Sequence, residues 1–478
     1  MLFNSAEFAV FLIVVFFLYW FPLKNSTRKQ NFLLLVSSYV FYGWWDYRFV
    51  FLLAFSTFLD YYTGLRIEQA ASQRARKAWL VLSVGINLGF LGFFKYYNFF
   101  IESFASLLGQ AGLQANIWTL NIILPVGISF YTFHGLSYVF DIYNKRVRPT
   151  TNFVDYAVFV SFFPLLVAGP IERATHLLPQ VQSPRKFDYA KSIDGLRQIL
   201  WGLFKKIVIA DTCAEYANTI FNNYGDYNGS TLFLGAVFFA FQIYGDFSGY
   251  SDIALGTARL LGFDLLKNFN YPYFSRDIAE FWRRWHISLS SWFRDYLYFP
   301  LGGSKGGVWK RIRNTFIIFL VSGFWHGANF TFIAWGFLNA LYFLPLLVLD
   351  KNRNNLDIVA QGRILPSIRE AAGMLVTFVL VVFAWIFFRS PTIHDAFSYV
   401  TGIFSRDLLQ MPQVFPKMVV LLIAFFMLIE WMGRERHFAL AGIGLRWKRP
   451  IRWGFYYLLV LLIISYSGKE QQFIYFQF

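Results

Sequence analysis

Two histidines are the side chains of this sequence best suited to proton chemistry. His326 interrupts the run from Thr315 to Asn329, which is otherwise almost wholly apolar and continues into a second apolar run, 330–348. An ionisable residue inside such a run is costly and marks a functional site by default. His286 stands forty residues earlier, in the basic and tryptophan-rich segment 280–295. A buried histidine preceded by a basic segment predicts chemistry carried out inside a bilayer.

His326 allows two interpretations. In a helix, Ser322 lies four residues before it and Asn329 three after it, so all three side chains share one face. Such neighbours fix the ring tautomer and leave one nitrogen free to act as a general base, for example on a hydroxyl that attacks an acyl thioester. The alternative is a structural histidine that is hydrogen-bonded across helices. No acidic ligand shares this run, so a metal site is not expected.

The segment 268–303 also has two interpretations. It could form one amphipathic helix at the membrane interface, with its tryptophans among the headgroups and its arginines outside them. It could instead bind the phosphates of coenzyme A or of a carrier-protein arm through its basic patch. The residues concerned are Trp282, Trp285, Trp292, Arg283, Arg284 and Arg294.

The composition is that of an all-α integral membrane protein. Hydrophobic residues make up 57% of the 478 residues and charged residues only 15%, whereas soluble domains carry about 25% charged residues. The net charge of +16 comes from basic residues between apolar runs, which indicates cytoplasmic loops and argues against nucleic acid as a partner. The single cysteine, Cys213, excludes a disulfide framework. We expect one polytopic domain over residues 1–478 that sits in a lipid bilayer.

The apolar runs predict eleven or twelve transmembrane helices, and the shorter runs could be re-entrant or interfacial. The expected spans are Phe8–Phe21, Asn31–Trp45, Phe49–Leu65, Ala78–Phe99, Ile117–Tyr143, Val154–Ala168, Thr231–Leu261, Thr315–Trp325, Phe330–Leu349, Ala371–Phe388, Met418–Trp431 and Trp453–Tyr466. Placing the basic loops in the cytoplasm puts both termini outside, and residues 170–228 are assigned to neither side.

The span Thr231–Leu261 carries two aspartates and a Gly-x-x-x-Gly spacing. Gly245 and Gly249 predict close packing against a neighbouring helix. For Asp246 and Asp252 we favour structural hydrogen bonding over participation in catalysis.

Several motifs together resemble the membrane-bound O-acyltransferase family, and most closely its bacterial alginate O-acetyltransferase branch, which has peptidoglycan and teichoic-acid modifying relatives. The resemblance rests on the segment 268–303 and on the run SGFWHGAN that ends at Asn329. The segments 1–5, 163–173 and 244–252 are similar as well. It implies a funnel-shaped single domain with a cytoplasmic entrance. It also implies that His326 is catalytic and that His286 takes part.

Residues 468–478 are expected to form an extracytoplasmic C-terminal tail. Its aromatic side chains could anchor it at the membrane interface. Phe-x-Tyr-x-x-Phe at the chain end also resembles the tail of relatives in which a tyrosine receives the acyl group. On this chain that residue is Tyr475.

The sequence therefore predicts an O-acyltransferase of the bacterial cytoplasmic membrane that holds no cofactor and takes acetyl-coenzyme A or another acyl thioester as donor. His326, His286 and Tyr475 are the expected catalytic residues. The expected substrate-binding residues are Trp282, Arg283, Arg284, Trp285, Ser322, Trp325 and Asn329. An extracytoplasmic SGNH-hydrolase-like acyltransferase is the expected partner and an envelope or extracellular polysaccharide the expected acceptor. The alternatives are D-alanyl transfer from a carrier protein to teichoic acid, and a transporter that uses His326 and Asp246 as a proton path.

Overall fold

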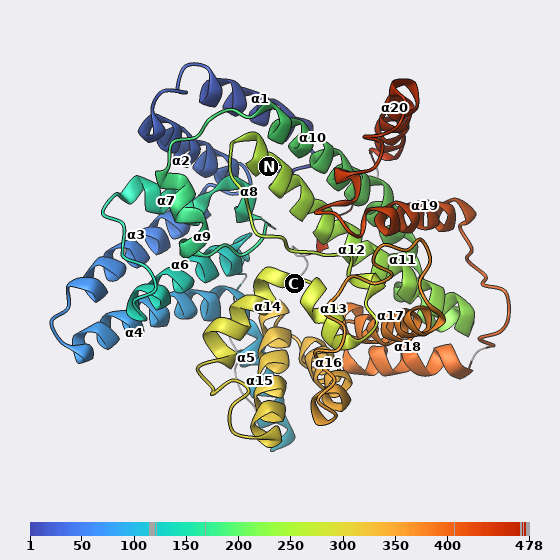
Figure 1. Ribbon diagram of the computed structural model, residues 1–478. Coiled ribbons are helices and arrows are strands. Elements are labelled where there is room, and N and C mark those ends of the chain that lie inside the picture. Colours follow the sequence, from blue (N-terminus) through green and yellow to red (C-terminus); the bar gives the residue numbers. More distant parts are fainter. Residues whose placement is uncertain are drawn as a thin grey trace. The chain divides into compact units, whose positions relative to one another are not determined.

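The computed structural model describes residues 1–113, 120, 122–167, 169–405, 407–468, 471, 473 and 474. Throughout these residues the regular elements are helices, as the sequence predicts (Figure 1). The chain divides into two compact units, the first formed by residues 1–192 and 258–266 and the second by residues 193–257 and 267–478. The expectation of a single domain stays a prediction.

Among the described residues, the first unit contains nine complete helices and a π-helical segment, η1 (Gly92–Tyr96), that joins two of them. The helices are α1 (Ala6–Trp20), α2 (Thr27–Gly43), α3 (Arg48–Gln69), α4 (Gln73–Leu91), α5 (Tyr97–Gln110), α6 (Ile128–Tyr143), α7 (Phe153–Ser161), α8 (Phe163–Leu166) and α9 (Ala174–Gln182).

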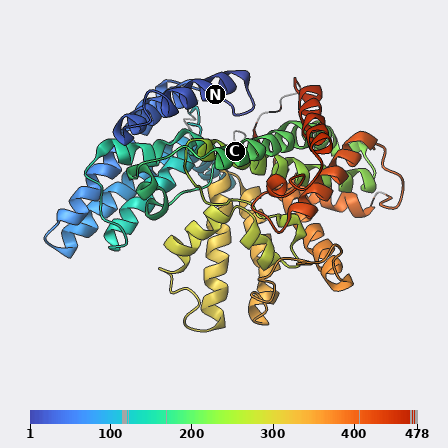
Figure 2. The same ribbon diagram turned by 45° about the horizontal axis from the view of Figure 1, so that its top comes forward.

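Helices α3 and α4 lie side by side as a hairpin, which both views show (Figures 1 and 2). Asp60 of α3 is buried between them and accepts hydrogen bonds from Ser83 at 2.6 Å and Asn87 at 2.8 Å. His134 of α6 is also fully buried, and its Nε2 accepts from the backbone N–H of Glu172 at 3.0 Å. Hydrogen bonds satisfy these buried polar groups, so they belong to the framework of the unit.

Two predicted spans of this unit are wrong in their bounds. Helix α6 begins at Ile128 and not at Ile117, because Gly127 adopts a left-handed conformation with a φ of 75°. The span expected at Val154–Ala168 is broken at Phe162, so that α7 and α8 are separate helices. Pro164 follows this break, and proline has no backbone N–H to continue a preceding helix.

The second unit holds most of α10 and α12 and all the helices that follow. Its elements are α10 (Tyr189–Leu203), the π-helix η2 (Phe204–Ala210), α11 (Asp211–Asn222), α12 (Gly229–Leu260), α13 (Ile278–Arg284), α14 (Ile287–Phe293), α15 (Val308–His326), α16 (Phe330–Val348), α17 (Ile368–Arg389), α18 (Ile393–Ser405), α19 (Lys417–Gly433) and α20 (Arg449–Tyr466). Short helical turns lie at Tyr224–Asp226, Pro272–Phe274, Arg294–Tyr298 and Ala439–Ala441.

Glycines set the distance between α12 and the run formed by α10 and η2. A Cβ on Gly245 would lie 2.8 Å from the carbonyl oxygen of Lys205, and one on Gly249 would lie 2.8 Å from that of Gly202. Real Cβ atoms do not approach so closely, so only glycine fits. This confirms the close helix packing predicted from the Gly-x-x-x-Gly spacing.

Helices α15 and α16 form the most extensively packed pair of the unit and lie side by side in both views (Figures 1 and 2). Gly323 of α15 faces the backbone carbonyl of Phe332, and Gly336 of α16 faces that of Phe319, with no space for a Cβ on either glycine. The two backbones therefore touch, and this contact holds the end of α15 that carries His326.

Four helical stretches among the described residues are long and apolar enough to cross a membrane: Gln73–Gln110, α12, α16 and α17. The first contains the predicted span Ala78–Phe99, and the last three agree with predicted spans to within a few residues at each end. For the other predicted spans, crossing of the membrane stays a prediction.

Candidate active site

A cavity of about 150 Å³ in the second unit is lined by both histidines singled out in the sequence. Its walls come from α13, α14, α15 and the two residues between α13 and α14. The lining residues are Trp282, Trp285, His286, Leu289, Ser290, Phe293, Ile318, Phe319, Ser322 and His326. Most of this surface is apolar, so the few polar groups on it are those able to orient a ligand.

His326 is the last residue of α15, at the end of a helix where the backbone dipole stabilises a positive charge. Its ring lies 5.2 Å from both the ring of Trp335 and that of Phe388, centroid to centroid. Trp325 contacts it from the preceding position at 4.8 Å. Aromatic rings thus hold the imidazole at the cavity wall, one helical turn beyond Ser322.

His286 joins α13 to α14 in a left-handed conformation, with a φ of 43° that costs a non-glycine residue about 1–2 kcal/mol. Its Nδ1 lies 3.0 Å from Oδ1 of Asn268. The same oxygen accepts from the backbone N–H of Ser288 at 3.4 Å and from its hydroxyl at 2.9 Å, which identifies it as the amide oxygen. Nδ1 therefore carries the ring proton, and this N–H donates a hydrogen bond to Oδ1 of Asn268.

The other ring nitrogen of His286, Nε2, is buried and has no hydrogen-bond partner among the described residues. His286 is 1% exposed and lines the cavity. Burial lowers its pKa from 6.5 to about 3, so the ring is neutral at physiological pH. It therefore presents a lone pair that can only accept a hydrogen bond.

Three other predicted site residues, Trp282, Trp285 and Ser322, line the same cavity. The indole N–H of Trp282 donates to Oδ1 of Asn339 at 3.2 Å. Trp285 packs against the ring of Phe281, 5.5 Å away. Trp325 does not line the cavity, but its ring contacts both histidines, lying 6.1 Å from the ring of His286. The structure thus brings these residues and both histidines together.

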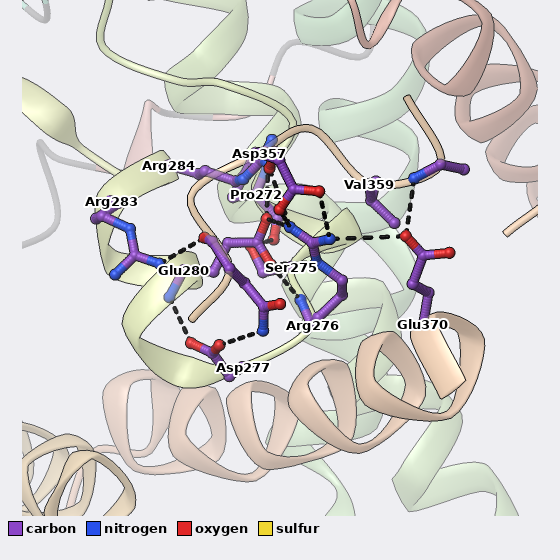
Figure 3. A network of polar contacts seen from close by, with 12 residues as sticks. Pro272, Ser275, Arg276, Asp277, Glu280, Arg283, Arg284, Asp357, Val359 and Glu370 are labelled. Atoms are coloured by element: carbon purple, nitrogen blue, oxygen red, sulfur yellow. Dashed lines mark hydrogen bonds and ion pairs between the residues drawn. The ribbon is translucent and has the colours of Figure 1, made fainter. Parts of the chain in front are cut away.

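Arg283 and Arg284 do not line the cavity, and both bind backbone carbonyls of the loop 350–366. Arg283 donates to the backbone carbonyls of Asn352 and Asn355, both at 2.8 Å. Arg284 is buried and forms an ion pair with Glu280 at 2.7 Å. Arg276 joins the same network and binds both Glu280 and Asp357 (Figure 3). These bonds favour a structural role for the two arginines.

Three expectations about individual residues changed. The single interfacial helix predicted for 268–303 is wrong, because the left-handed His286 breaks it and Trp285 and Trp292 are buried. A shared helical face through Asn329 is wrong as well, because α15 ends at His326 and Asn329 instead caps α16 by accepting from the N–H of Thr331. Tyr475 lies outside the described residues.

The sequence analysis missed Asn268, and it missed Leu289 and Phe293 as parts of the cavity wall. Asn268 precedes His286 by eighteen residues and lies in a non-helical stretch before α13, so no helical periodicity relates the two side chains. In the described part of the chain, no cluster of three or more His, Cys, Asp or Glu side chains could hold a metal ion.

The model of the membrane-bound O-acyltransferase family matches residues 36–369, which include the whole cavity. The chain belongs to this family. This membrane-bound O-acyltransferase is 40% identical over 415 residues to the probable alginate O-acetylase AlgI of Pseudomonas aeruginosa, covering 87% of this chain and 77% of that protein. It is 38% identical to the protein of the same name from Pseudomonas putida over the full length of both. The peptidoglycan O-acetyltransferase of Helicobacter pylori is 34% identical over 84% of this chain and 79% of its own length.

These relatives confirm the resemblance to the alginate O-acetyltransferase branch. The protein is therefore an integral-membrane O-acyltransferase. The family and these relatives favour an enzyme over the transporter that the sequence left as an alternative. Moreover, Asp246, its second proposed proton carrier, is paired with Lys206 at 2.8 Å and does not line the cavity.

Proposed function

We propose that this membrane-bound O-acyltransferase moves an acetyl group from acetyl-coenzyme A to a hydroxyl acceptor at the cavity lined by His286 and His326. The observation that carries the proposal is this shared cavity, which joins a histidine at a helix end to a second one with a free lone pair. One imidazole can take the proton of an attacking hydroxyl while the other holds that hydroxyl by a hydrogen bond.

His326 removes that proton and His286 orients the hydroxyl. A pKa of about 3 makes His286 a weak base at neutral pH, so its Nε2 serves as a hydrogen-bond acceptor. The hydroxyl oxygen forms a bond to the acyl carbon as its proton passes to His326. The carbon–sulfur bond of the thioester then breaks, and the leaving thiolate takes the proton back from His326.

The cavity favours acetyl over D-alanyl. A cavity of about 150 Å³ holds a benzene-sized molecule, which is ample for an acetyl group. The ammonium of a D-alanyl group needs a carboxylate or several acceptors when it is buried. None of the described residues that line this cavity is an aspartate or glutamate.

Tyr475 is proposed as the first acceptor. Its phenol attacks the thioester, and the resulting aryl ester is reactive enough to pass the acetyl group on. An SGNH-hydrolase-like acyltransferase outside the membrane would then place the group on an envelope or extracellular polysaccharide. Positively charged loops between the apolar helices support a place in the bacterial cytoplasmic membrane with both termini outside.

The decisive experiment measures acetyl transfer by His326→Ala in membranes that contain wild-type amounts of the protein. We expect release of coenzyme A and acetylation of the acceptor to fall about 10²–10⁴-fold, the usual contribution of a general base. His394→Ala, at an exposed position of α18, is the matched control and should retain full activity. Unchanged polysaccharide acetylation in His326→Ala would overturn the proposal. Supplying D-alanyl carrier protein in place of acetyl-coenzyme A distinguishes the two donors.

A further inference from the structure

A second cluster of buried charges lies outside the histidine cavity. Lys206 of η2 forms ion pairs with Asp211 at 2.7 Å and with Asp246 of α12 at 2.8 Å. All three side chains are at most 4% exposed. One ammonium and two carboxylates leave an excess negative charge, and a buried carboxylate is costly unless hydrogen bonds compensate it.

The C-terminal segment supplies the missing bonds. The backbone N–H of Ile474 donates to Oδ2 of Asp246 at 2.7 Å. The backbone carbonyl of Gln471 accepts from Nζ of Lys206 at 3.2 Å. An ammonium has three N–H donors, and Asp211, Asp246 and Gln471 provide three acceptors. The segment is thus part of the charged cluster and completes it.

Apolar packing strengthens the same contact. The ring of Phe473 lies 4.2 Å from that of Tyr250, centroid to centroid, one helical turn after Asp246 on α12. Phe473 is 1% exposed and Ile474 is fully buried. A segment that only rested at the membrane interface would not bury both its side chains and its backbone polar groups inside the protein.

Helix α12 contacts both this segment and His286. Phe247 follows Asp246 directly on α12, and its ring lies 4.7 Å from the imidazole of His286. Ile474, whose amide is held by Asp246, directly precedes the candidate acyl acceptor Tyr475 in the sequence. In the same way, Asp246 directly precedes Phe247, which contacts His286.

We propose that Lys206, Asp211 and Asp246 form a docking site for the C-terminal segment through residues 471, 473 and 474, and that this docking positions Tyr475 to accept the acyl group. Asp246 is its principal positioning residue, because it holds the backbone amide next to the tyrosine. The positioning part of this inference rests on the proposed relay through Tyr475, whereas the docking itself does not.

The sharpest test removes one hydrogen bond from the docked segment of the full-length protein. Ile474→Pro deletes the N–H that donates to Asp246, and Ile474→Ala retains it. Asp246→Asn removes the charge from the docking site. Asp252→Asn is its matched control. Asp252 lies on α12 as Asp246 does and pairs with Lys205 of η2 at 2.5 Å, but it has no hydrogen bond to residues 471, 473 or 474.

Two readouts separate docking from positioning. Release of the C-terminal residues by carboxypeptidase reports docking, and the fraction of acetylated Tyr475, determined by mass spectrometry after addition of acetyl-coenzyme A, reports positioning. We expect Ile474→Pro and Asp246→Asn to release the segment faster and to lower acetylation of Tyr475 about tenfold or more, since a hydrogen bond to a charged group is worth that factor. Ile474→Ala and Asp252→Asn should stay near the wild type in both readouts.

The outcomes are distinct. Resistance of Ile474→Pro and Asp246→Asn to carboxypeptidase at the wild-type level would overturn the docking. Faster release with undiminished acetylation of Tyr475 would overturn the positioning. Absence of acetyl-Tyr475 in the wild-type protein, with acetylation of the polysaccharide intact, would refute the proposed relay and with it the positioning, and the carboxypeptidase result would still decide whether the segment docks.

Discussion

Oδ1 of Asn268 lies 3.0 Å from Nδ1 of His286 and determines which ring nitrogen carries the proton. The backbone N–H of Ser288 shares this oxygen, so the amide cannot turn over without losing that bond. Asn268 thereby converts a residue with two possible tautomers into a fixed hydrogen-bond acceptor. Catalytic histidines depend on such partners for their tautomer and orientation.

Asn268→Asp should shift the pH dependence of acyl transfer. A carboxylate beside Nδ1 favours the protonated ring, so the pKa of His286 rises above its value of about 3. Protonated His286 no longer accepts a hydrogen bond at Nε2. We expect the acidic limb of kcat/KM to move upward by about 1–3 pH units. Asn354→Asp, at an exposed loop position, is the control, and an identical pH profile for Asn268→Asp would contradict the role given to His286.

The stability of the protein should fall as the pH drops from 7 to 5. The folded state keeps His286 neutral because its pKa is about 3, whereas the unfolded chain takes up a proton near pH 6.5. The unfolded state then binds more protons, so the free energy of unfolding decreases by at most about 1.4 kcal/mol per pH unit. Thermal unfolding of the solubilised protein measures this loss. His286→Gln should show a smaller loss over the same interval, and an equal loss in both proteins would contradict the assignment.

Gly323→Ala should separate α15 from α16 and disturb the cavity. The added Cβ meets the backbone carbonyl of Phe332, which is not free to move away as a side chain would be. Overpacking of this kind costs about 1–3 kcal/mol, and Gly323 directly follows Ser322 of the cavity wall. We expect a lower melting temperature and a raised KM for acetyl-coenzyme A. Gly89→Ala, whose added Cβ would have nothing within 4 Å of it, should leave both unchanged.

Leu289→Ala should widen the range of acyl groups that the enzyme accepts. Leu289 lines the cavity, and its truncation makes room for a longer chain. Each methylene buried there contributes about 0.8 kcal/mol, so butyryl transfer should gain roughly tenfold relative to acetyl transfer. The ratio of kcat/KM for the two coenzyme A thioesters tests this. Leu347→Ala, in α16 and outside the cavity lining, controls for general destabilisation, and an unchanged ratio in Leu289→Ala would show that this cavity does not hold the acyl group.

Local apolar patterns predicted several of the long helices well. The bounds expected for α12, α16 and α17 differ from the structure by only a few residues at each end, because a long, mainly apolar segment in a membrane satisfies its own backbone polar groups as a helix. The prediction failed where a single backbone conformation breaks the run. Helix α6 begins only after the left-handed Gly127, and His286 separates α13 from α14 within 268–303.

The candidate site was predicted in part. Apolar surroundings singled out His326, and both histidines stand in motifs that resemble the family, so the sequence alone indicated both as candidates and identified the family. Arg283 and Arg284 show the limit of such reasoning. Their charge suggested phosphate binding, and only the structure places the loop 350–366 beside them. A basic side chain looks the same in the sequence whether its partner is a ligand or a carbonyl of the chain.

The sequence by itself determined the helical membrane class and the family, and it indicated the two histidines as candidate site residues, because these depend on residue type and local spacing. Only the tertiary structure decided that Asn268 leaves Nε2 of His286 as an acceptor and that Asp246 holds the amide of Ile474. Asp246 and Ile474 are 228 residues apart in the chain. Contacts over such separations follow from how helices pack, and no periodic pattern in the sequence records them.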